Sequence, residues 1–91
     1  MLAVLAPGPV VTLNRVVALA MVDGPAAALA ELDAVEPELA GYHRVHAVRA
    51  HLLEQAGDPR AARAAYRRAA ELTLSVPERR YLLARAARVA E

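Results

Sequence analysis

The chain has 91 residues, of which 57% are hydrophobic and 23% charged, so it can form one small domain with a packed core. It contains no cysteine, which excludes a disulfide scaffold, a cysteine nucleophile and a zinc–cysteine site. Alanine, leucine and valine dominate the apolar residues, and Phe, Trp and Ile do not occur. Because alanine is the best helix former, this composition favours an all-α fold.

The net charge is only +1, but the two halves of the chain differ in sign. Residues 1–42 carry one arginine against five acidic residues, whereas residues 43–91 carry ten arginines against five. A basic half can attract an acidic partner or nucleic acid. The alternative is that the charged residues lie on solvated helix faces and are divided between the two halves by chance. Neither a helix-turn-helix pattern nor a row of stacking aromatics accompanies the arginines, so direct DNA binding is the weaker alternative.

Membrane and export signals are not evident in the sequence. The apolar stretches are shorter than a bilayer-spanning helix needs and are broken by Arg, Asp or Pro. Residues 1–5 are apolar but lack a basic flank and are too short for a signal-peptide core. We therefore expect a cytoplasmic protein without a membrane partner.

Proline and glycine divide the chain into short segments whose apolar residues recur at intervals of three and four, which is typical of amphipathic helices. We expect Glu36-Pro37 through Gly41 to form a loop. Gly57 suits a left-handed C-cap, Asp58 an N-cap, and Ser75 with Glu78 has capping-box spacing. Helices are predicted at roughly 10–22, 25–36, 42–56, 59–74 and 76–90.

The sequence repeats with a period of about 34 residues, so that Pro25 falls on Pro59 and Ala28 on Ala62. A pair of antiparallel helices in each such period is the tetratricopeptide (TPR) pattern. Small residues at fixed positions let the two helices nest, and a larger residue fills the gap beside them. The repeat positions are Val16, Leu19, Ala28, Leu32, Ala50, Leu53, Ala62, Tyr66 and Ala69.

We therefore predict an all-α, TPR-like antiparallel helix-pair array of about two and a half repeats and five helices. The repeats span 9–42 and 43–76, and a capping helix spans 77–90. Residues 1–8 are expected to be the stub of a preceding helix and a linker, which would make this domain part of something longer. A fortuitously apolar N-terminus is the alternative.

Two stretches resemble a known family more closely than a generic TPR repeat. Residues 9–35 contain Leu13-Asn14-Arg15 within a pattern of the form PVVxLNR, and residues 42–82 open on Tyr42-His43-Arg44-Val45-His46-Ala47-Val48-Arg49-Ala50. Both resemble the C-terminal TPR-like extension of extracytoplasmic-function (ECF) RNA polymerase sigma factors. The family's Asn-Pro-x-Glu-Arg-Arg reads Ser75-Val76-Pro77-Glu78-Arg79-Arg80 here, which changes the helix cap.

The resemblance implies a regulatory or interaction module, because sigma regions two and four, which bind core polymerase and promoter DNA, are not present in these residues. Its contacts would be with the sigma regions, with core polymerase or with a separate regulator. The alternative from another class is a free-standing TPR-like adaptor, or a self-association module that forms a homodimer through its N-terminal edge.

TPR arrays usually bind partners in the groove lined by the first helix of each repeat. In this register the second repeat and the capping helix contribute Arg44, His51, Glu54, Gln55, Tyr81, Arg85 and Arg88. The first repeat contributes Val10, Leu13, Val17, Ala20 and Met21. A groove that is apolar at one end and arginine-rich at the other suits an extended or helical peptide with an acidic end.

The remaining polar and aromatic residues are more simply explained by structure than by a ligand. His43, His46 and His51 share part of one helix, but no carboxylate or cysteine completes a metal site, and the resemblance makes His46 a packing residue. We expect Asn14 and Arg15 to tether a neighbouring loop or helix end. The tyrosines 42, 66 and 81 are expected to fill gaps, and the arginines 63, 67 and 68 to form a solvated face.

Residues with catalytic potential are not apparent. The sequence lacks an activated serine or cysteine, a carboxylate pair set in a pocket, and a glycine-rich phosphate loop. We therefore expect no enzymatic activity, no cofactor, no metal and no small-molecule substrate.

Overall fold

The structure is a computed structural model that describes residues 8–39, 42 and 44–89. Over these residues the chain forms five α-helices and one 3-10 turn, and no strand. The elements are α1 (Pro9–Asp23), α2 (Pro25–Val35), η1 (Glu36–Leu39), α3 (Arg44–Gln55), α4 (Pro59–Leu72) and α5 (Val76–Arg88). The predicted all-α array of five helices is confirmed. Within the described ranges, none of these helices is long and apolar enough to cross a membrane.

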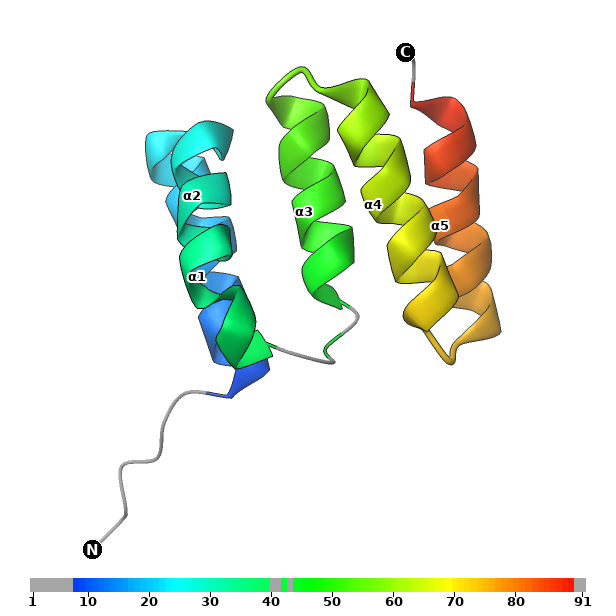
Figure 1. Ribbon diagram of the computed structural model, residues 1–91, viewed down its shortest axis with the longest axis horizontal. Coiled ribbons are helices and arrows are strands. Elements are labelled where there is room, and N and C mark those ends of the chain that lie inside the picture. Colours follow the sequence, from blue (N-terminus) through cyan, green and yellow to red (C-terminus); the bar gives the residue numbers. More distant parts are fainter. Residues whose placement is uncertain (1–7, 40–41, 43, 90–91) are drawn as a thin grey trace, which may run out of the picture.

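The helices stand side by side in chain order, with the α1–α2 pair at one end and α5 at the other (Figure 1). Extensive contacts join α1 to α2, α3 to α4 and α4 to α5, and α2 packs on α3 to connect the first pair to the rest. The helix boundaries lie within two residues of the predicted ones. Residues 1–7, which include the predicted stub, lie outside the described residues.

Glycine and proline set most of the helix ends. Gly24 between α1 and α2, and Gly57 after α3, have φ angles of +93° and +85°, a region that other residues enter only with strain. Asp58 caps α4 by accepting a hydrogen bond from the Ala61 amide (3.2 Å). The glycine and aspartate caps predicted at positions 57 and 58 are thus present.

Two local predictions need correction. The expected loop after α2 begins with the turn η1, and Leu39 at its end is buried, because an apolar side chain there can close the core beneath α2. At the start of α5, Ser75 accepts from the Glu78 amide (3.2 Å), but the Glu78 carboxylate accepts from the Thr73 hydroxyl. The Ser75 amide also donates to Thr73 (3.2 Å), so only half of the predicted capping box forms.

Helix α3 divides the interior into two hydrophobic clusters. In the first cluster, Val45 and Leu52 of α3 are buried with residues of α1, α2 and η1. In the second cluster, Ala50, on another side of the same helix, is buried with residues of α4 and α5. Because α3 belongs to both clusters, it holds the two ends of the array together.

Several alanines are completely buried between the helices, where a larger side chain would force the helices apart. Ala28 in the first cluster and Ala50, Ala62 and Ala69 in the second are completely buried. The Tyr66 ring fills the space beside them and is itself fully buried. Of the nine predicted repeat positions, Val16, Ala28, Leu32, Ala50, Ala62, Tyr66 and Ala69 are buried, and Leu19 and Leu53 are half-buried.

Candidate functional site

The groove positions named from the first repeat line two adjoining hollows between α1 and α3. The hollows have volumes of about 200 and 360 Å³ and share Val17 and Val48. Helix α1 contributes Val10, Leu13, Asn14, Val17, Ala20 and Met21. The other side is formed by Tyr42, Arg44, Val48, His51, Leu52 and Gln55.

This α1–α3 groove, which we define by the two hollows, has apolar walls and a weakly basic edge. Met21 is 84% exposed and Val10 55% exposed, although both are large apolar side chains on α1. Carboxylates do not occur among the described residues that line it, and Arg44 is the one lining residue that is always charged. The groove can therefore accept an apolar segment and attract a carboxylate towards Arg44.

Further along the array, Glu54 and Arg85 contact each other rather than standing open to a partner. Arg85 Nη2 of α5 lies 2.8 Å from Glu54 Oε1 of α3, and both side chains are half-buried. The sequence assigned both residues to the binding groove, with Arg85 in its basic end. The structure shows that this arginine pairs with a carboxylate within the domain, and the groove assignment of the two residues stays a prediction.

The hydroxyl of Tyr66 lies at the centre of the same polar cluster. It donates to Glu54 Oε1 (2.8 Å) and lies 3.0 Å from His51 Nδ1. Because a tyrosine has a single hydroxyl proton, His51 must carry its own proton on Nδ1 and donate it to the tyrosine oxygen. The same oxygen lies 3.4 Å from Arg85 Nη2, and the His51 ring meets the Tyr66 ring edge-on with 5.3 Å between centroids. Tyr66 thus fills the core and also positions three polar side chains.

The environment of this cluster fixes its charges at neutral pH. Burial lowers the pKa of His51, and the neighbouring Arg85 lowers it further, so this histidine is neutral. The hydrogen bond from Tyr66 lowers the pKa of Glu54, and Arg85 adds to that effect. Burial raises the pKa of Tyr66 to about 12. The cluster therefore contains one ion pair and two neutral rings.

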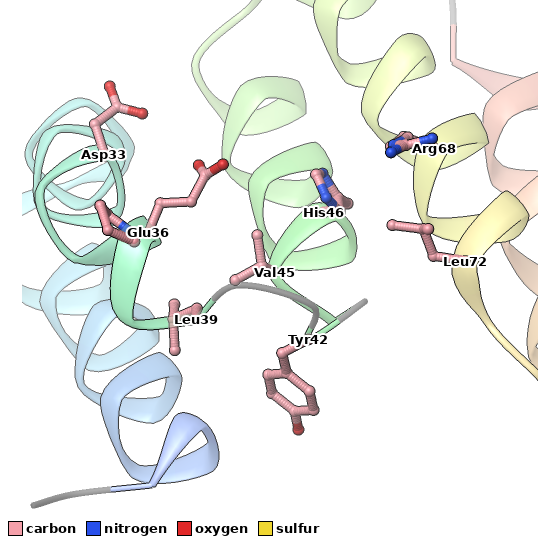
Figure 2. A pocket seen from close by; sticks show the side chains of 9 residues that line it. Asp33, Glu36, Leu39, Tyr42, Val45, His46, Arg68 and Leu72 are labelled. Atoms are coloured by element: carbon pink, nitrogen blue, oxygen red, sulfur yellow. The ribbon is translucent and has the colours of Figure 1, made fainter.

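A larger hollow of about 540 Å³ lies between α2, η1, α3 and α4 (Figure 2). Asp33 and Glu36 lie on one side of it, with His46 and Arg68 opposite. Arg49 of α3, which is not among the lining residues, lies 2.8 Å from Asp33 Oδ1 and also pairs with Glu36.

The charged groups of this hollow are thus compensated within the domain. Arg68 pairs with Glu71 of its own helix (3.1 Å). Burial lowers the pKa of His46, which makes it neutral at pH 7. We therefore take the α1–α3 groove as the candidate site, because its apolar walls are exposed and its described lining residues include Arg44 but no carboxylate.

Sequence reasoning missed the bridge from Arg49 to α2. The signal was present, because Asp33 and Glu36 are three residues apart and share a helix face, but nothing in the sequence says which arginine they meet. A bridge of this kind fixes α3 against α2 and needs no bound ligand.

Several predicted positions lie elsewhere than expected. Tyr81 is 50% exposed on α5, so it is not a gap filler, whereas Tyr42 is half-buried against the first cluster. Arg63 is half-buried and donates to the Val89 carbonyl (2.8 Å), which corrects its placement on a solvated face. Arg67 and Arg68 are exposed, as predicted for a solvated face, and Asn14, Arg15 and Arg88 are exposed as well.

Half of the ten arginines in residues 43–91, including Arg63, make contacts within the domain. Arg49, Arg68 and Arg85 pair with carboxylates. Arg79 donates to the carbonyl oxygens of Ala70 (3.3 Å) and Thr73 (3.2 Å). Seven of the ten arginines are exposed, and Arg49, Arg63 and Arg85 are half-buried. In the part of the chain that the structure describes, which leaves out His43, no three acidic or histidine side chains are grouped closely enough to hold a metal ion.

Comparison with known proteins gives a match to a bacterial protein. The chain is 44% identical over 78 residues to an uncharacterized protein of Rhizobium meliloti (strain 1021). The match covers 86% of this chain but 18% of that protein, so the chain spans about a fifth of the length of the curated relative it matches. No family model and no solved structure matches the chain.

Proposed function

We propose that this domain is a TPR-like protein-interaction module that regulates transcription as the C-terminal extension of an ECF-type sigma factor. It acts in the cytoplasm through protein contacts rather than catalysis. The observation that carries the proposal is the α1–α3 groove, which has exposed apolar side chains and, among its described lining residues, Arg44 but no carboxylate.

The partner in this proposal is a segment of the sigma regions that has apolar side chains and an acidic residue at one end. Val10, Val17 and Met21 would receive the apolar side chains, since they already face the hollows with large exposed areas. The acidic residue would lie beside Arg44, because the described lining residues supply no competing carboxylate.

The motifs that resemble the sigma-factor extension support this assignment through their positions. Leu13 is a buried residue at the floor of the groove, and Asn14 and Tyr42 line its edge. Arg49 and Ala50 hold α3 in place, one through the bridge to α2 and the other by complete burial. A relative more than five times as long as the matched segment supports a module that works within a larger polypeptide.

The experiment that tests the proposal is a binding titration with sigma regions two and four of a sigma factor that carries this domain, produced as a separate protein. We expect the wild-type domain to bind, and Val17→Glu and Arg44→Glu each to weaken binding about tenfold, which corresponds to about 1.4 kcal/mol. Arg80→Glu serves as the matched control, because Arg80 is exposed on α5, outside the groove.

Thermal unfolding of each variant followed by circular dichroism separates lost binding from lost structure. Val17 is 40% exposed and Arg44 is exposed, so both variants should unfold at nearly the wild-type temperature. Wild-type affinity in the two groove variants would refute the groove as the binding site, and absence of wild-type binding would refute the sigma regions as the partner.

A further inference from the structure

The first helix of each repeat presents one face towards the helix that precedes it in the chain. On α3 this face includes Val45 and Leu52, which are buried in the cluster that contains residues of α2. On α5 the counterpart of Leu52 one repeat later is Ala86, which is buried in the cluster that contains residues of α4. The counterpart of Val45 is Arg79, which donates to the Ala70 carbonyl of α4 (3.3 Å). In both helices the preceding helix contacts this face, although Arg79 itself is exposed.

The same face of α1 is exposed. The residues that correspond to Val45 and Leu52 are Val11 and Ala18, and Val22 follows one turn later. Val11 is 54% exposed, Val22 is 81% exposed, and Ala18 is exposed too. This strip of α1 is therefore apolar, like the face of α3 that contains Val45 and Leu52. Unlike that face, it is exposed.

A charged residue at the edge of this face indicates what could cover it. On α3, Arg49 pairs with Asp33 (2.8 Å) and Glu36, which lie three residues apart at the C-terminal end of α2 and the start of η1. Its counterpart one repeat earlier is Arg15, which is exposed on α1. Arg15, Val11 and Val22 lie within about 40° of arc at about 100° per residue, so one helix could contact all three.

We propose that this outer face of α1, formed by Val11, Arg15, Ala18 and Val22, binds an acidic amphipathic helix and so extends the array by one helix. The occupant carries apolar residues on one side and two carboxylates three residues apart at its C-terminal end, as α2 does. The chain itself contains the template for this contact, since Arg49 and its apolar neighbours hold α2 in that way. This surface is separate from the α1–α3 groove, because Val10, Val17 and Met21 lie on another side of α1.

The probe that tests this inference is a fluorescent peptide with the sequence of residues 25–39, held helical by a lactam bridge away from its apolar side. It contains Asp33 and Glu36 at the required spacing, together with Leu32, Val35 and Leu39. We expect fluorescence anisotropy to show binding to the wild-type domain. Arg15→Glu should weaken this binding about tenfold, and a peptide with arginine at both acidic positions should recover the loss.

Matched variants separate this surface from the alternatives. Val11→Asp with Val22→Asp should abolish binding without lowering the unfolding temperature, because both valines are exposed. Arg80→Glu and the groove variant Met21→Glu should bind as the wild type does. Equal affinity in Arg15→Glu and wild type, loss of binding in Met21→Glu, or no binding at millimolar peptide would each overturn the proposal. A wild-type dimer that Val22→Asp converts to a monomer would also overturn it, because the occupant would then be a second copy of the chain.

Discussion

Arg85 of α5 and Glu54 of α3 form an ion pair, with 2.8 Å between Nη2 and Oε1, beside the hydroxyl of Tyr66 of α4. Three helices that are consecutive in the chain thus meet at one set of polar atoms. Tyr66 is buried among alanines of these helices. Because alanine side chains are small, the helices can pack closely enough for this contact. The polar cluster of Glu54, Tyr66 and Arg85 therefore helps to hold α3, α4 and α5 together. This structural role can be tested separately from partner binding.

The Glu54–Arg85 pair should contribute to stability beyond the sum of its members. We expect Arg85→Ala and Glu54→Gln to show an interaction energy of about 0.5–3 kcal/mol in a double-mutant cycle measured by urea unfolding. The same cycle on Arg68 and Glu71, an exposed pair on α4, should give about 0.3–0.5 kcal/mol. Equal values for the two cycles would show that the lower solvent exposure of the first pair contributes nothing.

The Tyr66 hydroxyl should be needed as well as its ring. Tyr66→Phe keeps the packing but removes the donor to Glu54 and the acceptor for His51, so we expect a loss of about 1–3 kcal/mol in the free energy of unfolding. Tyr42→Phe, at a half-buried position on the edge of the first cluster, is the comparison variant and should lose less. A Tyr66→Phe variant as stable as the wild type would contradict the assigned role.

The bridge from Arg49 to α2 should connect the first helix pair to the rest of the array. Arg49→Gln is expected to destabilise the domain by about 1 kcal/mol, a modest amount because the Asp33 carboxylate is exposed to solvent. Hydrogen exchange should accelerate first in α1 and α2, since the arginine links these helices to α3. Uniform acceleration through all five described helices would contradict a local role for the bridge.

Stability should fall in two steps on acidification. Burial lowers the pKa of His46 and His51 below 6.5, so the unfolded chain binds protons at a higher pH than the folded domain. Their contribution is present above pH 6.5 and is lost as the pH falls below it. The lowered pKa of Glu54 adds a contribution that is present above pH 4.5 and lost below it. His46→Gln with His51→Gln should remove the first step from urea unfolding curves measured between about pH 7.5 and 5. An unchanged pH profile would contradict the neutral state assigned to both histidines.

The helices could be predicted from the sequence because proline and glycine mark their ends and apolar spacing marks their inner faces. The caps at Gly57 and Asp58 depend on local backbone chemistry and were predictable for the same reason. Burial of Ala28 and Ala62 followed from the sequence repeat, since equivalent positions in a repeat share an environment.

The polar contacts of the site could not be predicted in the same way. Periodicity assigns Glu54 and Arg85 to faces of their helices, but not to each other, because they are 31 residues apart and their distance depends on how α3 and α5 pack on α4. Leu39 was assigned to a loop for a similar reason. The turn η1 depends on tertiary burial of that side chain more than on the propensities of a Glu-Pro-Glu-Leu segment.

The central claim, that the α1–α3 groove binds the sigma regions, is tested most directly by site-specific photocrosslinking in cells. A photoreactive amino acid would replace Met21, which is 84% exposed at the groove, and in a separate strain Leu74, which is 97% exposed between α4 and α5. We expect crosslinks from position 21 to sigma regions two or four, identified by mass spectrometry, and none from position 74. Crosslinks to those regions from position 74 alone would contradict binding of the sigma regions in the groove. The absence of such crosslinks from both positions would contradict it as well.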